Sequence, residues 1–160
     1  MIKVQTEDFD ISFETKMLKN GRHDVGAIVS FVGTVRQEKI NANKDSKILL
    51  SMLLEHYPGM TERELKRIEK EALDRWDLQN CLILHRYGEL LPGDNIVLVI
   101  TLSRHRKDAF EAASFLMDYL KTSAPFWKKE TFAQQGANQA DWVKAKSEDM
   151  KATKAWQKRN

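Results

Sequence analysis

Hydrophobic and polar residues follow two patterns along this chain, and the patterns mark the expected strands and helices. Short runs rich in β-branched and aromatic residues predict strands, whereas apolar residues three and four positions apart predict helices. The predicted strands cover residues 2–4, 25–35, 48–57, 81–90, 95–102 and 128–132, and the predicted helices cover 11–20, 61–76 and 104–122. The turn signal at 91–94 predicts a hairpin. This irregular mixture is typical of an α+β domain with an antiparallel sheet and packed helices.

Short polar side chains mark the expected helix starts. Asp10 and Ser103 can each cap a helix by accepting a backbone N–H. Thr61 and Glu64 form a T-x-x-E capping box. The first helix is expected to end at Gly21, where glycine permits the left-handed conformation.

Each predicted helix carries an apolar stripe that we expect to face a sheet. The stripes consist of Ile11, Phe13, Met17 and Leu18; of Leu65, Ile68, Ala72, Leu73 and Trp76; and of Ala109, Phe110, Ala113, Leu116, Met117 and Leu120. The strand 25–35 is expected to be buried. The polar stretch 37–47 has neither period and reads as a mobile loop, whose lysines are either solvated or border an anionic substrate.

Length and composition indicate one domain that stays out of the membrane. The chain has 160 residues, of which 42% are hydrophobic, enough to bury a single core. No apolar run approaches the roughly 20 residues that span a bilayer, and the N-terminus is acidic rather than greasy, so we expect a cytoplasmic protein. The single cysteine, Cys81, excludes an internal disulfide and a multi-thiolate metal site, and we expect it in the core.

The net charge of +3 is concentrated at the C-terminus. Residues 144–160 carry six basic and two acidic residues, a charge of +4, which leaves −1 for residues 1–143. The predicted domain, 1–143, therefore has no basic footprint for nucleic acid. We expect the basic tail, 144–160, either to cover a partner interface or to remain flexible.

The candidate chemistry is cationic, because no acid pair or nucleophile triad competes with the basic residues. His105 and Arg106 lie at the predicted start of a helix, where free N–H groups can bind an anion; the alternative is a solvated helix end. Lys121 and Lys128 flank the segment SAPFW. If they share a pocket, each disfavours the charge of the other, and one becomes a neutral amine able to act as nucleophile or base. Alternatively, Lys121 only offsets the helix dipole.

Spacing constrains how these cations can cooperate. His105 and Lys121 are 16 positions apart on one predicted helix, which is roughly 24 Å at 1.5 Å per residue. Either the two serve different sites, or a two-fold dimer brings His105 and Arg106 of one chain beside Lys121 and Lys128 of the other. We favour the dimer.

Other conspicuous residues have simpler explanations. His56 closes a predicted strand, but no second histidine lies at ligand spacing, so we expect structural hydrogen bonding and no metal. Trp76, Trp142 and Trp156 lack interleaved basic residues and are expected to pack rather than to stack on bases. Neither standard glycine-rich phosphate loop is present, and no cofactor is expected.

Five segments together resemble a known family. They are GAIVSFVGTVR (26–36), LEHYPGM (54–60), HRYGELLPGD (85–94), SRHRKDAFEAASFLMDYLK (103–121) and TSAPFWKKE (122–130). In this order they are similar to the large, catalytic subunit of molybdopterin synthase. The resemblance implies an α/β hammerhead-type fold and a homodimer within a heterotetramer, in which each large subunit binds a small ubiquitin-like sulfur carrier.

The resemblance also implies an activity and a site. The carrier's C-terminal Gly-Gly thiocarboxylate would enter the large subunit and convert cyclic pyranopterin monophosphate into the dithiolene molybdopterin, without a metal at this step. By residue match, Lys121 and Lys128 would be the catalytic lysines, Arg36 would belong to their pocket, and His105 with Arg106 would bind substrate from the neighbouring subunit. In supporting roles, Phe126 and Trp127 would shape the pocket wall, and Glu130 would orient Lys128.

Two other classes of function remain as alternatives. A non-catalytic module could capture the C-terminus of a ubiquitin-like protein, although one cation would suffice for capture and this chain has two lysines. An RNA-binding α+β domain would show affinity that falls steeply with salt, and the −1 charge of residues 1–143 argues against it.

Overall fold

The computed structural model describes residues 1–42, 45–134, 137–143 and 153–156, and it arranges them around two sheets. The first sheet has the order β1 (Ile2–Gln5), β5 (Leu78–Arg86), β7 (Asn95–Ser103) and β2 (Ala27–Thr34). The second has the order β3 (Lys39–Ala42), β4 (Asp45–His56), β8 (Phe126–Gln134) and β9 (Ala137–Val143), with β6 (Gly88–Leu90) also paired to β4. All of these pairings are antiparallel except β1 with β5. The α+β prediction is therefore confirmed.

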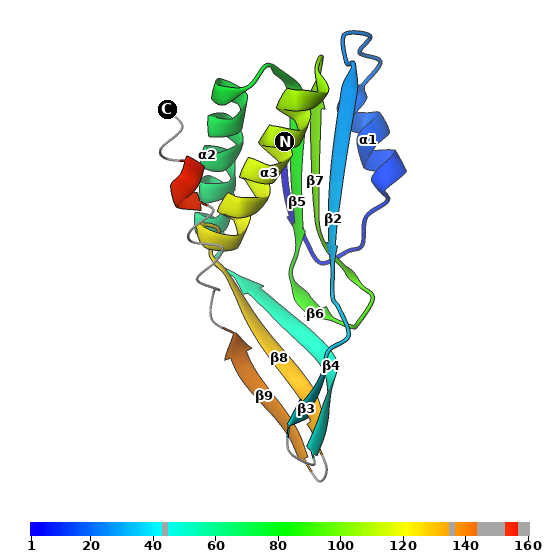
Figure 1. Ribbon diagram of the computed structural model, residues 1–160, viewed down its shortest axis with the longest axis vertical. Coiled ribbons are helices and arrows are strands. Elements are labelled where there is room, and N and C mark those ends of the chain that lie inside the picture. Colours follow the sequence, from blue (N-terminus) through cyan, green and yellow to red (C-terminus); the bar gives the residue numbers. More distant parts are fainter. Residues whose placement is uncertain (43–44, 135–136, 144–152, 157–160) are drawn as a thin grey trace.

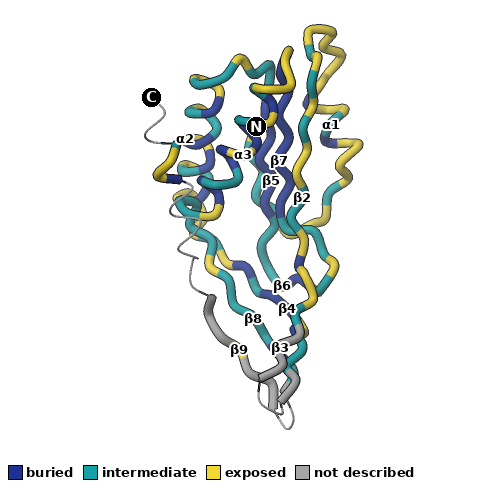
Figure 2. The backbone as a smooth tube through the Cα atoms, viewed as in Figure 1, coloured by how far each residue is buried: buried dark blue, intermediate teal, exposed yellow. Residues whose placement is uncertain are grey.

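Three helices cover the first sheet, while the second sheet extends away from them (Figure 1). Helices α2 (Met60–Arg75) and α3 (Arg106–Thr122) pack with Cys81, Ile83 and Val99 on one face of the sheet. Leu82, Leu84 and Leu98 pack on the opposite face with α1 (Ile11–Lys19). Because side chains alternate along a strand, β5 and β7 are apolar on both faces, and they form the most deeply buried part of the molecule (Figure 2). The predicted burial of Cys81 is confirmed.

A third apolar cluster joins the two sheets. It contains Val35, Leu49, Met52, Leu54, Leu90 and Phe132. Its members come from β4, β6, β8 and the residue that follows β2. Between β5 and β7 the chain leaves the first sheet, and β6 pairs with β4 of the second sheet. The predicted hairpin between 81–90 and 95–102 is thus confirmed as the antiparallel pair β5 and β7. The short strand β6 lies between them in the sequence. Among the described residues, no helix has the length and apolar character needed to cross a membrane.

Two expectations about the strands are wrong. Strand β2 was expected to be buried, but Ile28 and Phe31 are each 42% exposed, because β2 lies at the edge of the first sheet with β7 as its partner. The stretch 37–47 was expected to be a loop, but it forms β3 and the beginning of β4, which pair antiparallel. The backbone hydrogen bonds of this hairpin do not require apolar side chains, so periodicity could not reveal it. Residues 43–44 lie outside the described part of the chain.

The helix starts follow the predicted chemistry at one of three positions. Asp10 caps α1 as expected, since its Oδ1 accepts the backbone N–H of Phe13 at 3.0 Å. Helix α2 starts earlier than the predicted capping box, directly after Gly59, which has a φ of +81°. The backbone N–H of Gly59 donates to the Glu62 carboxylate at 2.5 Å. Helix α3 starts after His105. Ser103, expected as its cap, is the last residue of β7. Its hydroxyl accepts the backbone N–H of His105 at 3.2 Å and donates to the carbonyl of Asp77 at 2.9 Å, but the N-cap position belongs to His105.

Several residues of the predicted apolar stripes are exposed. They are Ile11, Phe13, Met17, Leu73 and Phe110, whose exposed fractions range from 38% to 63%. In α1, the inward positions are taken by Leu18 and Glu14. The Glu14 carboxylate is buried because both of its oxygens accept from Lys3 at 2.7 Å. A charged residue can thus occupy an inward position when a partner strand supplies a counter-charge.

One part of the basic tail packs against the domain. The short helical segment 153–156 places Trp156 5.7 Å from Phe115 and 5.8 Å from Trp76, measured between ring centroids. The indole N–H of Trp156 donates to Asp118 at 2.8 Å. The expected packing role of Trp76 and Trp156 is confirmed. The predictions for residues 144–152 and 157–160 lie outside the described residues.

Candidate functional site

The first strand residues after α3 carry three of the predicted site residues on one face. Phe126, Lys128 and Glu130 alternate along β8 and therefore point to the same side. They lie opposite His56, Leu54 and Met52 of β4. Lys128 Nζ is 2.7 Å from Glu130 Oε1, and the Glu130 side chain is only 13% exposed. The ion pair fixes the ammonium group of Lys128 on the face of β8 that also carries part of the third apolar cluster.

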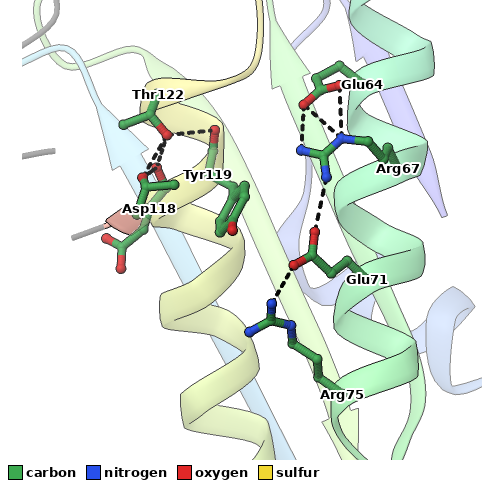
Figure 3. Close-up of polar contacts among 8 residues, drawn as sticks. Glu64, Arg67, Glu71, Arg75, Asp118, Tyr119 and Thr122 are labelled. Atoms are coloured by element: carbon green, nitrogen blue, oxygen red, sulfur yellow. Dashed lines mark hydrogen bonds and ion pairs between the residues drawn. The ribbon is translucent and has the colours of Figure 1, made fainter. Parts of the chain in front are cut away.

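Lys121 lies just before the connection from α3 to β8. It is exposed and belongs to the last turn of α3, which ends at Thr122. The Thr122 hydroxyl donates to the carbonyl of Asp118 at 2.9 Å and lies 2.8 Å from the hydroxyl of Thr153 (Figure 3 shows the contacts within α3). Lys121 and Lys128 thus stand at the two ends of one short connection, and several hydrogen bonds hold the end that Lys121 occupies.

Arg36 follows β2 where the chain passes from the first sheet to the second. Its Nη2 is 2.6 Å from Glu38 Oε1, and its side chain is 80% exposed. The preceding residue, Val35, is buried in the same apolar cluster as Leu54, the cross-strand partner of Lys128. The backbone at Arg36 is therefore anchored in the cluster that supports Lys128.

His105 and Arg106 lie at the opposite end of α3 from Lys121, and one chain does not bring them together (Figure 1). Their turn is seated tightly on β2. Gly26 donates its N–H to the Ser103 carbonyl at 3.0 Å. A Cβ at Gly26 would lie 2.3 Å from the carbonyl oxygen of Arg104. The backbone of this turn can approach β2 so closely because residue 26 has no side chain.

Phe126 and Trp127 were expected to form one aromatic wall, but successive residues of β8 point to opposite faces. Phe126 stacks on His85, with ring centroids 3.7 Å apart and an interplanar angle of 17°. Trp127 lies on the other face and is 47% exposed. Within one chain, the two rings therefore line different surfaces.

The sequence reasoning assigned no site role to two histidines beside Phe126. His85 is 9% exposed, and burial lowers its pKa to about 4, so its ring is neutral at neutral pH. The expected structural hydrogen bond of His56 is not found at Nδ1, which is buried without a partner among the described residues and lies 3.9 Å from Glu62 Oε1. The burial of His85 could have been predicted from the sequence, because alternation along β5 places its side chain on the same face as Cys81 and Ile83.

No group of three or more histidine, cysteine or acidic residues that could hold a metal ion occurs within the described ranges. The candidate residues that the structure places around the start of β8 and the end of α3 include the basic side chains of Lys121 and Lys128. Such an arrangement can gather anionic groups and can supply an amine as a nucleophile or a proton carrier.

Comparison with known proteins identifies the family. The model of the MoaE protein family matches residues 4–123. A protein from Mesorhizobium japonicum named molybdopterin synthase catalytic subunit is 49% identical over 155 residues, which cover 97% of this chain and 92% of that protein. The solved structure of the molybdopterin biosynthesis MoaE protein from Burkholderia ambifaria has a TM-score of 0.78 and 46% identity, covering 98% of this chain and 97% of that one.

A more distant solved structure shares the fold. It is a protein-protein complex of subunits 1 and 2 of molybdopterin-converting factor from Helicobacter pylori, with a TM-score of 0.64 and 21% identity, covering 81% of this chain and 83% of that one. The fold, the family model and the close relatives agree, and the chain belongs to the MoaE protein family.

Proposed function

We propose that this chain is the catalytic subunit of a cytoplasmic molybdopterin synthase. It transfers sulfur from the C-terminal thiocarboxylate of a small ubiquitin-like carrier to cyclic pyranopterin monophosphate, and two transfers produce the dithiolene of molybdopterin. The relatives' name supports the activity, and the complex of two subunits from H. pylori supports a small partner. The domain proper is residues 1–143, and the basic tail follows it.

The observation that carries this proposal is the placement of Lys121 and Lys128 at the two ends of the α3–β8 connection. The pterin phosphate and the carrier thiocarboxylate are both anionic and repel each other, so cations are needed to bring them together. Lys128, held by Glu130 at 2.7 Å, is a fixed positive group that can stabilise charge developing on the reacting carbonyl. Lys121 is exposed at the helix end and assists the transfer, through its amine, by contacting the carrier terminus.

The second cationic group is supplied by a second copy of the chain. His105 and Arg106 lie about 16 residues of helix away from Lys121, which is roughly 24 Å. A two-fold dimer lets His105 and Arg106 of one subunit complete the pocket that contains Arg36, Lys121 and Lys128 of the other. With one carrier on each catalytic subunit, the assembly is a heterotetramer.

The test mixes the purified chain with thiocarboxylated carrier and cyclic pyranopterin monophosphate and follows the pterin by mass spectrometry. The pterin should gain two sulfurs with the wild-type chain and none with Lys121→Ala or Lys128→Ala. Lys129→Ala is the matched control, because Lys129 lies between the site residues of β8 but points to the opposite face. Sulfur transfer at the wild-type rate by Lys121→Ala would remove that lysine from the mechanism. A stable carrier complex without any sulfur transfer would favour the non-catalytic binding module.

A further inference from the structure

The short segment 153–156 packs against the end of α3 that carries Lys121. Thr153 is only 9% exposed, and its hydroxyl lies 2.8 Å from the Thr122 hydroxyl and 3.3 Å from the Asp118 carbonyl oxygen. Thr122 is the last residue of α3 and directly follows Lys121. Thr153 lies 31 positions after Thr122. A distant part of the chain therefore contacts the helical turn that holds one of the two lysines of the proposed site.

Trp156 fixes the other end of this segment on the domain. Its ring packs against Trp76 and Phe115, with centroid distances of 5.8 and 5.7 Å. Its indole N–H donates to the Asp118 carboxylate at 2.8 Å. Asp118 therefore receives contacts from both ends of the segment, from Thr153 at its backbone carbonyl and from Trp156 at its side chain.

A row of ion pairs on α2 holds the segment from a second side. The Trp156 carbonyl accepts from Arg75 Nη1 at 3.1 Å, and Nη2 of the same guanidinium donates to Glu71 at 2.6 Å. Glu71 also accepts from Arg67 at 3.0 Å (Figure 3). The guanidinium carbon of Arg75 lies 5.0 Å from the centre of the Phe115 ring. Because these contacts fix Arg75, the segment is held between two helices and its position does not depend on α3 alone.

The end of α3 lacks the left-handed cap that commonly closes a helix. Asn20 closes α1 with a φ of +40°, but Ser123 after α3 has a φ of −111°, and Ala124 has no positive φ either. The last carbonyl groups of a helix have no N–H partner in a following turn. In α3, the hydroxyls of Thr122 and Thr153 lie against the Asp118 carbonyl instead. Contacts from outside the helix thus supply part of what a cap would supply.

We infer that the 153–156 segment is a brace that positions Lys121, and that the Thr153 hydroxyl is its contact on the last turn of α3. This inference rests on the proposed function, because it takes Lys121 as the group that assists sulfur transfer. Thr153 acts through Thr122 and is a positioning residue. Successive side chains leave a helix about 100° apart around its axis, so the brace restricts the backbone beside Lys121 while the Lys121 side chain stays exposed.

The experiment changes the Thr153 hydroxyl and measures both turnover and local order. Thr153→Val keeps the shape of the side chain without the hydroxyl, and Thr153→Ser keeps the hydroxyl. Lys154→Ala is the matched control, because Lys154 is exposed in the same segment. In the sulfur-transfer assay, kcat of Thr153→Val should fall about fivefold or more, because a slightly misplaced group lowers the rate. KM for the carrier and for the pterin should stay within about twofold.

The two other variants and hydrogen exchange separate positioning from general stability. Thr153→Ser and Lys154→Ala should keep kcat within about twofold of the wild-type value. Amide hydrogen exchange, followed by mass spectrometry, should become faster at residues 119–123 in Thr153→Val alone, while exchange in β5 and β7 stays unchanged. A general loss of stability would instead speed exchange throughout the sheet.

The contrary outcomes are distinct. A wild-type kcat in Thr153→Val would overturn the brace, and so would an equal loss in Thr153→Ser, which would trace the effect to packing and not to the hydroxyl. A raised KM for the carrier with unchanged kcat would mean that the segment contacts the partner, and would also overturn it. If exchange at 119–123 rises in Thr153→Val alone but the wild-type chain transfers no sulfur, the brace on α3 stands and the proposed function fails.

Discussion

Replacing Gly26 by alanine tests how tightly the His105 turn is seated on β2. The new Cβ would lie 2.3 Å from the carbonyl oxygen of Arg104, so the two backbones must separate by nearly 1 Å. Overpacking of this kind costs about 1–3 kcal/mol, and weakening the bond from the Gly26 N–H to Ser103 adds about 1 kcal/mol. Loss of glycine's freedom in the unfolded chain returns roughly 0.4–1 kcal/mol. The net destabilisation should be about 1–3 kcal/mol.

The same shift should reduce turnover, because it displaces the segment that carries His105 and Arg106. A misplacement near 1 Å can lower a rate by about 100-fold, and we expect a loss of about 10- to 100-fold. Urea denaturation measures the free energy of unfolding, and the sulfur-transfer assay measures turnover. Wild-type values in both would refute the reasoning. A loss of stability with normal turnover would mean that the position of the His105 turn does not affect catalysis.

Gly33, on the strand β2 that follows Gly26, provides the control. A Cβ there would meet Val97 Cγ1 at 2.7 Å, which is a side-chain atom and can be removed. Gly33→Ala should therefore destabilise the chain, and Gly33→Ala with Val97→Ala should relieve that clash. Because the obstacle at Gly26 is a backbone carbonyl, no second substitution can relieve it in the same way.

Three further predictions concern single side chains. His85 has a pKa of about 4 in the folded protein and roughly 6.5 in the unfolded chain, so its contribution to the free energy of unfolding should be complete above pH 6.5 and fall by about 3 kcal/mol as the pH approaches 4. In His85→Phe, the free energy of unfolding measured in urea should change less with pH over that range. Burial raises the pKa of the Cys81 thiol, so Cys81 should resist thiol reagents until denaturant is added. Trp156→Ala should lower stability by about 2–4 kcal/mol, because it removes two aromatic contacts and the bond to Asp118; an unchanged melting temperature would contradict this.

Local patterns were sufficient for most elements of the fold. Apolar runs located β4, β5, β7 and β8, and helical spacing located α1, α2 and α3, because both signals depend on residues close in sequence. The position of a strand within its sheet was not accessible in this way. β2 has the composition of a buried strand, yet its place at the edge depends on pairing with residues far along the chain. For the same reason, the exposure of Phe110 could not be predicted from its helix alone.

The candidate site could be predicted only in part. The separation of His105 from Lys121 followed from helix geometry, and the α3–β8 connection places Lys121 and Lys128 at its two ends. The Lys128–Glu130 ion pair follows from the two-residue period of a strand. The pocket between the start of α2 and the α3–β8 connection could not be predicted, because it joins residues 60–67 to residues 123–125 across the fold.

The pairing of β2 with β7 has a consequence for the order in which the protein is made. Strand β2 leaves the ribosome early, but the partner it needs, residues 95–103, is synthesised much later. Until then its apolar residues, including Val32, which packs against the core in the complete fold, have no sheet to join. Nascent chains halted before residue 95 should therefore expose an unpaired apolar strand that is prone to aggregation. Chaperone binding during synthesis should concentrate in that interval and end once β7 emerges.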